Sequence, residues 1–292
     1  MLVVTVPATL SNLGPGYDTL GLALSLLNRF EFEPGDDWRA EGATVDPDAH
    51  LTLRTARRAV EHFGGDLPGL HVRQQEHVPR SRGLGSSATA RVAGLLAALE
   101  LGGVRAPLDD QLTFLAAEEG HPDNVVPAMV GGLAVVDVRE GGVAHLRLAP
   151  PKLHVAICVP DVEVPTDEAR RLLPSSVSRD DAVFNLRRLG FLLVGLLEGV
   201  DGAVTSGLDD RMHQSCRAPL IGPVDQAFAR AKASGALGAF ISGSGSTLAA
   251  FCHGDELAAQ VAEAMASAFE EQGLACKPMV LTPVARGALA SH

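Results

Sequence analysis

Hydrophobic positions recur along the chain with two different spacings, which predict two kinds of element. Short runs rich in β-branched residues are typical of strands and are expected at residues 2–6, 22–32, 70–75, 133–138, 153–159, 239–242, 247–251 and 279–281. Longer segments with apolar residues three and four positions apart are expected to be helices, following Ala88 and at residues 108–119, 180–197, 224–233 and 258–269. The pattern therefore predicts a fold that contains both helices and strands.

Two consecutive prolines after Ala149 separate two of the predicted strands. Proline lacks a backbone N–H and fits poorly inside regular elements, so this segment is expected to be a connection. We therefore expect a domain boundary here, with an N-terminal domain at residues 1–150 and a C-terminal domain at residues 151–292.

The charge balance disfavours two classes of binding protein. The chain has 292 residues, 24 Lys and Arg against 35 Asp and Glu, and a formal net charge of −11. A nucleic-acid-binding protein needs a clustered positive surface, and so does a protein held by charge on anionic lipid. We therefore expect neither nucleic acid nor a membrane among the partners.

Cysteine usage and apolar runs predict a cytoplasmic protein. The chain has no C-x-x-C pair, so we expect small buried thiols rather than metal ligands at Cys158, Cys216, Cys252 and Cys276. The first seven residues lack the pattern of a signal peptide. The longest apolar run, residues 191–197, is far shorter than the roughly 20 residues that span a bilayer.

The strongest chemical signal is a segment rich in glycine and serine between a predicted strand and a predicted helix. We call it the phosphate loop, and it comprises Pro79, Arg80, Ser81, Arg82, Gly83, Leu84, Gly85, Ser86, Ser87, Ala88 and Thr89. Glycine allows the backbone to approach a ligand closely, and a helix N-terminus presents unpaired N–H groups and partial positive charge. This combination suits phosphate. It is not a Walker A loop, because no lysine follows the glycines.

Local charge supports this interpretation against the alternative, which is an ordinary glycine turn capped by Ser86. Residues 73–91 contain four arginines and one glutamate, in a protein that is acidic as a whole. An acidic enzyme that binds a polyanion needs such a local reversal of the field.

Two other segments place polar side chains in predicted loops. Residues 6–18, rich in Gly, Pro and Asn, deliver Asn12 and Asp18 after a strand. Glu118 and Glu119 end a predicted helix before a polar loop. Taken alone, these residues are also explained as turn formers and a solvated helix end. Carboxylate oxygens, however, also suit Mg²⁺, which takes one or two of them together with phosphate oxygens.

In their order along the chain, these segments resemble the GHMP small-molecule kinases. The glycine-rich motif of that superfamily is matched at residues 79–88, its opening motif at residues 7–18, and its Ser-Gly-Ser-Gly motif at residues 242–245. Three further segments resemble the homoserine kinase family within this superfamily. They are residues 120–125, the Asn-x-x-Arg pattern at 185–188 and the Asp-Arg-x-His-Gln pattern at 210–214. The chain departs from the usual pattern at Leu10, Ser11, Thr89 and Ser246.

The resemblance implies an α+β, two-domain GHMP kinase fold, with an S5-like N-terminal domain and a ferredoxin-like C-terminal domain. It implies ATP-dependent phosphorylation of the hydroxyl of L-homoserine to O-phospho-L-homoserine, for threonine biosynthesis. ATP is then expected on the phosphate loop, with Mg²⁺ between Ser87 and Glu119. Glu118 is the alternative ligand, because adjacent helical residues point about 100° apart. We also expect a homodimer.

The resemblance also implies an acceptor site for a zwitterion. The substrate carboxylate suits the donor fork of Arg188 or Arg217, and the ammonium suits Asp18. Asn12 and Asn124 would orient the ammonium and the reacting hydroxyl. Phosphoryl transfer mainly needs alignment and charge neutralisation, so we expect Asn124, Ser87 and Glu119 to be the catalytic residues, with Asp123 as an alternative general base. A GHMP kinase for mevalonate, a sugar or shikimate and a non-catalytic binding module are the alternative functions.

Overall fold

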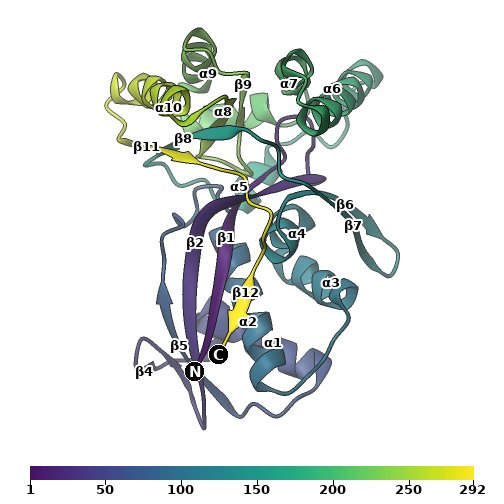
Figure 1. Ribbon diagram of the computed structural model, residues 1–292, viewed down its shortest axis with the longest axis vertical. Helices are drawn as coiled ribbons and strands as arrows, with labels where there is room; N and C mark the ends of the chain where they lie inside the picture. Colours follow the sequence, from purple (N-terminus) through teal and green to yellow (C-terminus); the bar gives the residue numbers. More distant parts are fainter.

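The computed structural model describes residues 1–292 and contains two β-sheets (Figure 1). The N-terminal sheet runs in the order β12-β1-β2-β5-β3-β4, and β6, paired with β7, joins it at β2. Its strands are β1 (Leu2–Ser11), β2 (Leu20–Gly35), β3 (Trp38–Ala40), β4 (Ala43–Thr44), β5 (Gly69–Gln75), β6 (Leu133–Arg139), β7 (Gly142–Leu148) and β12 (Leu289–Ser291). The last strand of the chain thus pairs with the first.

Helices cover one face of the N-terminal sheet, and Figure 1 shows them together on one side of β1 and β2. They are α1 (Leu51–Phe63), preceded by the 3₁₀ turn Pro47–Ala49, α2 (Ser86–Leu101), α3 (Leu108–Glu119) and α4 (Pro122–Val130). In β1, Leu2, Val4 and Val6 are fully buried, whereas Val3 and Thr5 are partly exposed. This alternation places one side of the strand in a core of 28 buried residues shared with α1, α2 and α4.

The C-terminal sheet has the order β11-β8-β10-β9 with antiparallel pairing throughout. Its strands are β8 (His154–Pro160), β9 (Gly238–Ile241), β10 (Leu248–Cys252) and β11 (Cys276–Leu281). The helices of this half are α5 (Thr166–Arg171), α6 (Arg179–Glu198), α7 (Asp201–Gly207), α8 (Gln214–Ile221), α9 (Val224–Ala233) and α10 (Asp255–Glu270). One strand, five helices, two strands, one helix and a last strand follow one another, which is the order of a ferredoxin-like unit with additional helices in its first connection.

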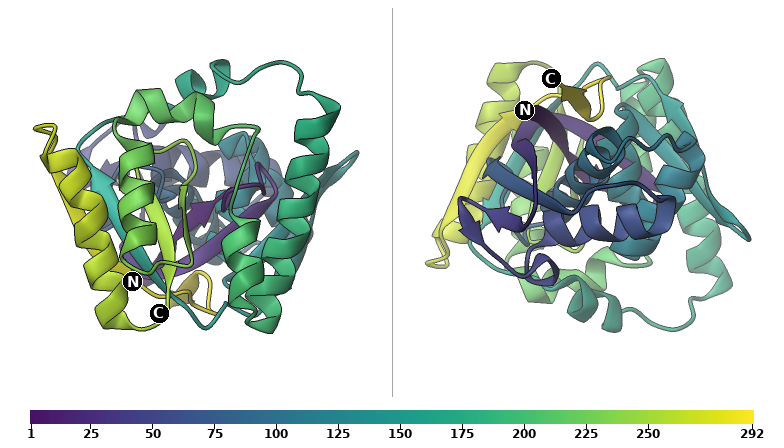
Figure 2. Two further views of the ribbon diagram at one scale, coloured as in Figure 1. Left: turned by 90° about the horizontal axis from the view of Figure 1, so that it is seen from above. Right: turned by 90° about the horizontal axis from the view of Figure 1, so that it is seen from below.

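A shared core joins the two halves. The far ends of β1 and β2 leave the N-terminal core, and Ala8, Leu10 and Leu22 pack instead with Ile157 and Phe251 of the C-terminal sheet. The other face of that sheet is covered by α9 and α10, as the view from above shows (Figure 2). The long strands β1 and β2 therefore carry the loop between them, residues 12–19, into the junction of the two halves.

The structure confirms the mixture of helices and strands and corrects one local prediction. The polar loop expected after Glu119 is helix α4, which begins at Pro122 after only Gly120 and His121. Proline at the first position of a helix is favourable, because its fixed φ fits and its missing N–H has no helical partner there. The predicted boundary at residue 150 falls between β7 and β8. No helix combines the length and the apolar composition needed to cross a membrane.

Candidate active site

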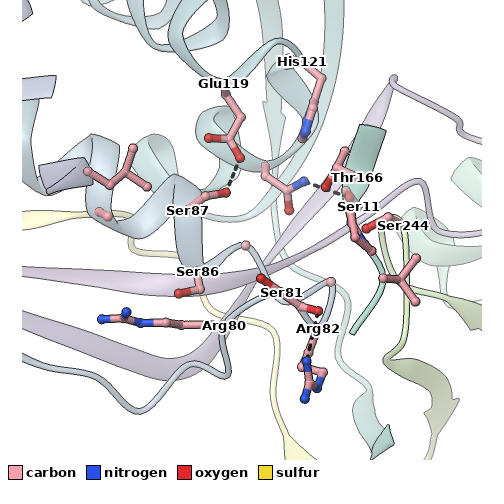
Figure 3. A pocket seen from close by; sticks show the side chains of 18 of the residues that line it. Ser11, Arg80, Ser81, Arg82, Ser86, Ser87, Glu119, His121, Thr166 and Ser244 are labelled. Atoms are coloured by element: carbon pink, nitrogen blue, oxygen red, sulfur yellow. Dashed lines mark hydrogen bonds between the residues drawn. The ribbon is translucent and has the colours of Figure 1, made fainter. Parts of the chain in front are cut away.

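A cavity of about 430 Å³ lies where the two halves meet (Figure 3). The residues Gln74, Glu76, Glu119 and Arg217 line it, together with six segments from both halves. They are the loop after β1, the start of α1, the phosphate loop, the start of α4, the connection that contains α5, and the turn at Gly243 and Ser244. The cavity therefore gathers residues of the opening motif, the phosphate loop, the segment at 120–125 and the Ser-Gly-Ser-Gly motif, but none of the patterns at 185–188 and 210–214.

The phosphate loop depends on two glycines with left-handed backbone conformations. Gly83 has φ +78° and Gly85 has φ +71°. A Cβ at Gly83 would collide with the carbonyl of Ser242, and one at Gly85 would collide with Oγ1 of Thr9. These glycines allow the loop to pack directly on neighbouring segments and to start α2 at Ser86.

The start of α2 is open to a ligand. Its first two residues, Ser86 and Ser87, line the cavity, and no side chain caps the helix. The N–H groups of the first turn, which have no partner within the helix, are therefore available to phosphate oxygens. Most of the predicted ATP residues line the cavity, namely Arg80, Ser81, Arg82, Gly83, Gly85, Ser86 and Ser87. The others, Pro79, Leu84, Ala88 and Thr89, do not line it.

Helix α3 points one of its two terminal carboxylates into the cavity. The Ser87 hydroxyl donates a hydrogen bond to Glu119, as Figure 3 shows, and Arg91 Nη1 lies 2.6 Å from the other carboxylate oxygen of Glu119. Glu118 instead forms an ion pair with Arg58 at 3.0 Å and does not line the cavity. The helix phase, which the sequence left open, therefore favours Glu119 as the metal ligand.

The donor set fits a magnesium ion that arrives with a nucleotide. The Ser87 hydroxyl and the Glu119 carboxylate are hard oxygen donors, which Mg²⁺ prefers. No group of three or more His, Cys, Asp or Glu side chains in the chain is placed to hold a metal ion by itself. Phosphate oxygens and water would have to complete the coordination, which is how Mg²⁺ is commonly bound beside phosphates.

Asn124 lies on the first turn of α4 with its amide oriented by two neighbours. Thr9 Oγ1 donates to its Oδ1 at 2.8 Å, and its Nδ2 donates to Ser11 Oγ at 3.0 Å. The side chain is only 7% exposed, yet it lines the cavity next to Gly85. Each end of the amide retains one further hydrogen-bonding position for a ligand.

Asn12 shapes the loop that presents Asp18. Its Nδ2 donates to the Gly243 carbonyl at 3.1 Å, and its Oδ1 accepts from the Asp18 backbone N–H at 3.0 Å. Asn12 and Asp18 have φ values of +68° and +50°, which are uncommon for residues other than glycine. Such strained conformations persist where the surrounding structure holds them, and they cluster at functional sites. Both side chains line the cavity.

Asp123 is occupied by a histidine. His121 Nδ1 lies 2.7 Å from Asp123 Oδ1, and Asp123 is 2% exposed. Burial alone would lower the pKa of His121, but the hydrogen bond and the charge of Asp123 outweigh it and raise that pKa above the ordinary value. The carboxylate of Asp123 is therefore already engaged by a neighbouring side chain.

Arg217 is a buried guanidinium without a carboxylate partner. It is 2% exposed, and its Nη1 donates to the Gly243 carbonyl at 2.6 Å while its Nε has no partner. Burial lowers the pKa of Arg217 from its ordinary value. A buried charge is strongly unfavourable unless it is paired, so this position in the cavity calls for an anionic ligand.

The segment before Arg217 holds α8 in place. Asp210 accepts hydrogen bonds from Asn185 Nδ2 at 2.7 Å and from the backbone N–H groups of His213 at 2.9 Å and Gln214 at 2.8 Å. His213 Nε2 in turn lies 2.8 Å from the Gly14 carbonyl, on the loop between β1 and β2. The Asp-Arg-x-His-Gln pattern thus anchors the start of the helix that carries Arg217.

Comparison with known proteins agrees with this geometry. Residues 50–132 match the family described as GHMP kinases N terminal domain, and residues 193–271 match GHMP kinases C terminal. The chain is 37% identical over 299 residues to a homoserine kinase of Moorella thermoacetica, with 99% of each chain covered. It is 39% identical over 284 residues to a homoserine kinase of Microchaete diplosiphon, covering 94% of this chain and 92% of that one.

The chain belongs to the homoserine kinase family of GHMP kinases. The crystal structure of homoserine kinase from Cytophaga hutchinsonii superposes with a TM-score of 0.87 at 28% identity, covering 99% of this chain and 97% of that chain. The two-domain GHMP kinase fold expected from the sequence is therefore confirmed.

One substrate residue expected from the homoserine kinase resemblance lies outside the cavity. Arg188 on α6 forms an ion pair with Asp209 at 3.4 Å, and its guanidinium lies 4.6 Å from the centre of the Phe184 ring. Asn185, one turn earlier on the same helix, is the residue that faces inward, toward Asp210. Sequence spacing identified the helix but not the direction of each side chain.

Three cavity residues had no signal in the sequence. Arg170, on the unpredicted helix α5, lines the cavity beside Asp18. His50 and Thr52, at the start of α1, also line the cavity, and His50 Nδ1 and Thr52 Oγ1 are buried without hydrogen-bond partners. Their residue types are unremarkable in isolation, and only the tertiary arrangement brings them to the cavity.

Replacing Gly85 by alanine tests the packing under the phosphate loop. The left-handed conformation costs alanine about 1–2 kcal/mol, and the added methyl group also meets Thr9. Gly103 is a matched control, because its φ of +69° is similar and a Cβ there meets nothing within 4 Å. We expect Gly85→Ala to lower the free energy of unfolding in urea more than Gly103→Ala does. Equal losses would contradict the close packing.

Proposed function

We propose that this chain transfers the γ-phosphoryl group of ATP to the hydroxyl of L-homoserine, giving O-phospho-L-homoserine for threonine biosynthesis. The observation that carries the proposal is the unpaired guanidinium of Arg217 in the same cavity as the uncapped start of α2. One feature suits an acceptor that carries a carboxylate, and the other suits a phosphate donor. Family membership supports the same pairing of substrates.

The phosphates of ATP would lie on residues 83–87, at the open N-terminus of α2. The nucleoside would extend toward His50 and Thr52, because these residues line the same cavity and have unpartnered polar atoms. Ser87 and Glu119 would hold Mg²⁺. When bound, Mg²⁺ neutralises charge on the phosphate oxygens, which phosphoryl transfer requires.

The acceptor would lie on the other side of the phosphate loop. Arg217 would bind the carboxylate, and Asp18 and Asn12 would face the ammonium. Asn124 would hold the hydroxyl, since its Oδ1 lies 3.2 Å from the position of a Cβ on Gly85 and so adjoins the phosphate loop.

The proposed chemistry needs no strong base. Asn124 can align the hydroxyl but cannot take up its proton, and the transfer passes through a loose transition state in which alignment and charge neutralisation dominate. Asp123, the alternative base, is engaged with His121. We therefore propose that Asn124, Ser87 and Glu119 act by positioning.

We further propose that the protein is a cytoplasmic homodimer whose domains divide near residue 150. The four free cysteines support a reducing compartment. For the dimer, the support is an apolar stripe on the outer face of α6, formed by exposed Leu186, Phe191, Val194 and Leu197. The support for the boundary is its place between β7 of the N-terminal sheet and β8 of the C-terminal sheet, and only β12 at the end of the chain returns to the N-terminal sheet.

The test of the proposed function is ADP release with L-homoserine, mevalonate, shikimate and galactose as acceptors. We expect kcat/KM to be highest for homoserine. Arg217→Leu should lower kcat/KM for homoserine by about 10- to 100-fold or more, mainly through KM, because a charge-assisted contact is worth about 1.5–3 kcal/mol. The KM for ATP should not change.

Arg211→Leu is the control for this variant, because Arg211 lies in the same segment but outside the cavity. Preference of the wild type for another acceptor would refute the substrate. A rise in the KM for ATP with an unchanged KM for homoserine would remove Arg217 from the acceptor site.

The metal site gives a second prediction with a control in the adjacent residue. Glu119→Gln should raise the Mg²⁺ concentration needed for half-maximal activity by about 10-fold or more, because it removes the charged oxygen donor. Glu118→Gln should leave it unchanged, since Glu118 pairs with Arg58 outside the cavity. The measurement is activity against free Mg²⁺ at saturating ATP. The reverse pattern would show that α3 presents Glu118 instead.

A further inference from the structure

Two residues of α2, one turn apart, contact the two carboxylate oxygens of Glu119. Ser87 and Arg91 are four positions apart and therefore stand on the same face of the helix. The Ser87 hydroxyl donates to one oxygen of Glu119, and Arg91 Nη1 lies 2.6 Å from the other. Ser87 and Glu119 line the cavity, whereas Arg91 does not. Arg91 therefore contacts the expected metal ligand from outside the cavity.

Arg91 is also tied to the backbone at the end of α3. Its side chain is 12% exposed and that of Glu119 is 5% exposed, so the pair is largely shielded from water. Arg91 Nε donates to the backbone carbonyl of Glu118 at 2.9 Å. The last carbonyls of a helix have no partner within it and carry partial negative charge, so a cation there is favourable. One guanidinium thus holds both the helix end and the carboxylate that projects from it.

The ion pair neutralises Glu119 but leaves it able to bind a second cation. The Glu119 oxygen nearest Arg91 is buried and accepts no hydrogen bond, so the contact is an attraction between charges rather than a directed hydrogen bond. A buried carboxylate without a cation is strongly unfavourable, and Arg91 removes that cost when no metal is bound. Mg²⁺ and the guanidinium have the same sign of charge, however, and would repel each other across one carboxylate.

We propose that Arg91 is a positioning residue whose charge keeps Glu119 from binding a divalent cation until a nucleotide is present. The inference rests on the proposed function, in which Ser87 and Glu119 hold Mg²⁺ beside the phosphates of ATP. Mg²⁺ alone meets a carboxylate that Arg91 has already neutralised, and nothing offsets the repulsion between the two cations. Phosphates supply the negative charge that offsets it, so the metal and the nucleotide bind together.

The neighbouring glutamate provides an internal comparison. Arg58 Nη2 lies 3.0 Å from Glu118 Oε1, and the Glu118 side chain is 8% exposed. This pair also neutralises a shielded carboxylate at the end of α3, but neither Glu118 nor Arg58 lines the cavity. Removing either arginine leaves a carboxylate unpaired, and only the loss of Arg91 does so beside Ser87 and the phosphate loop.

The test measures the binding of Mn²⁺, which takes the same oxygen ligands as Mg²⁺, to the protein without nucleotide or acceptor. Binding is followed by the loss of the EPR signal of the free ion. Arg91→Gln should bind Mn²⁺ about 10-fold more tightly than the wild type or better, because the variant loses both the neutralising charge and the repulsion. The double variant Arg91→Gln/Glu119→Gln should lose this gain.

Two single variants separate the charge of Arg91 from its place in the fold. Arg91→Lys keeps a positive charge beside Glu119, so it should bind Mn²⁺ as the wild type does. Arg58→Gln is the matched control, because it leaves Glu118 unpaired outside the cavity, and it should also match the wild type. Thermal unfolding midpoints show whether each variant is folded. A non-hydrolysable ATP analogue should narrow the difference between the wild type and Arg91→Gln.

Several results would overturn the inference. They are equal Mn²⁺ affinity in the wild type and Arg91→Gln, a gain that Arg91→Lys or Arg58→Gln shares, a gain that persists in the double variant, and a difference that the ATP analogue does not narrow. Should Arg91→Gln fail to fold, the wild type decides, because tight Mn²⁺ binding without nucleotide that Glu119→Gln abolishes would contradict the inference. Inactivity of the wild type with homoserine would instead overturn the proposed function, and it would leave the Mn²⁺ comparison intact.

Discussion

The site depends on backbone hydrogen bonds that join three distant segments beneath the phosphate loop. Strand β1, the phosphate loop and the turn after β9 are separated by dozens of residues, yet each donates to or accepts from another. The bonds are Thr9 N–H to Leu84 O at 3.1 Å, Gly243 N–H to Ser11 O at 3.2 Å and Thr247 N–H to Arg82 O at 3.0 Å. Neither half of the protein contains a complete site, because the phosphate loop, Asn124 and Arg217 are positioned only when these segments meet.

The lining of the cavity is balanced in charge, although the molecule as a whole is strongly acidic. Four arginines and four carboxylates line it, namely Arg80, Arg82, Arg170 and Arg217, and Asp18, Glu76, Glu119 and Asp123. The protein carries a net charge of −11, but the cavity contains an open helix N-terminus and a buried arginine without a carboxylate partner. Substrate anions would satisfy both features, so binding would relieve a cost built into the free protein. The loop of left-handed residues around Asn12 and Asp18 adds local strain at the same place. The site is therefore preorganised for its ligands, at a cost to the folding stability of the free protein.

Local patterns in the sequence were sufficient to predict where the phosphate loop lies between a strand and a helix. They were not sufficient to predict which side of a helix each side chain faces. The glycine-serine segment was expected to lie between a strand and a helix, and it does, although α2 begins at Ser86, two residues before the expected start at Ala88. The sequence does not distinguish Glu118 from Glu119, whereas the structure does, because Glu119 lines the cavity and Glu118 pairs with Arg58. Arg188 shows the same limit on α6, where it faces Asp209.

Tertiary contacts account for the rest. Arg170 meets Asp18 across 152 positions of sequence, and no periodicity or composition announces such a pair. Pro122 at the start of α4 did carry a local signal, because proline favours the first turn of a helix, but the surrounding polar residues were interpreted as a loop. The difference matters for the chemistry, since a helix holds Asn124 more rigidly than a loop would.

A crystal structure of the protein with L-homoserine and a non-hydrolysable ATP analogue tests the central claim most directly. The account predicts that the β- and γ-phosphates lie on the N–H groups at the start of α2, with the amino-acid carboxylate against Arg217 and the hydroxyl on Asn124. An amino acid bound with its carboxylate away from Arg217, or a nucleotide whose phosphates do not contact residues 83–87, would contradict it.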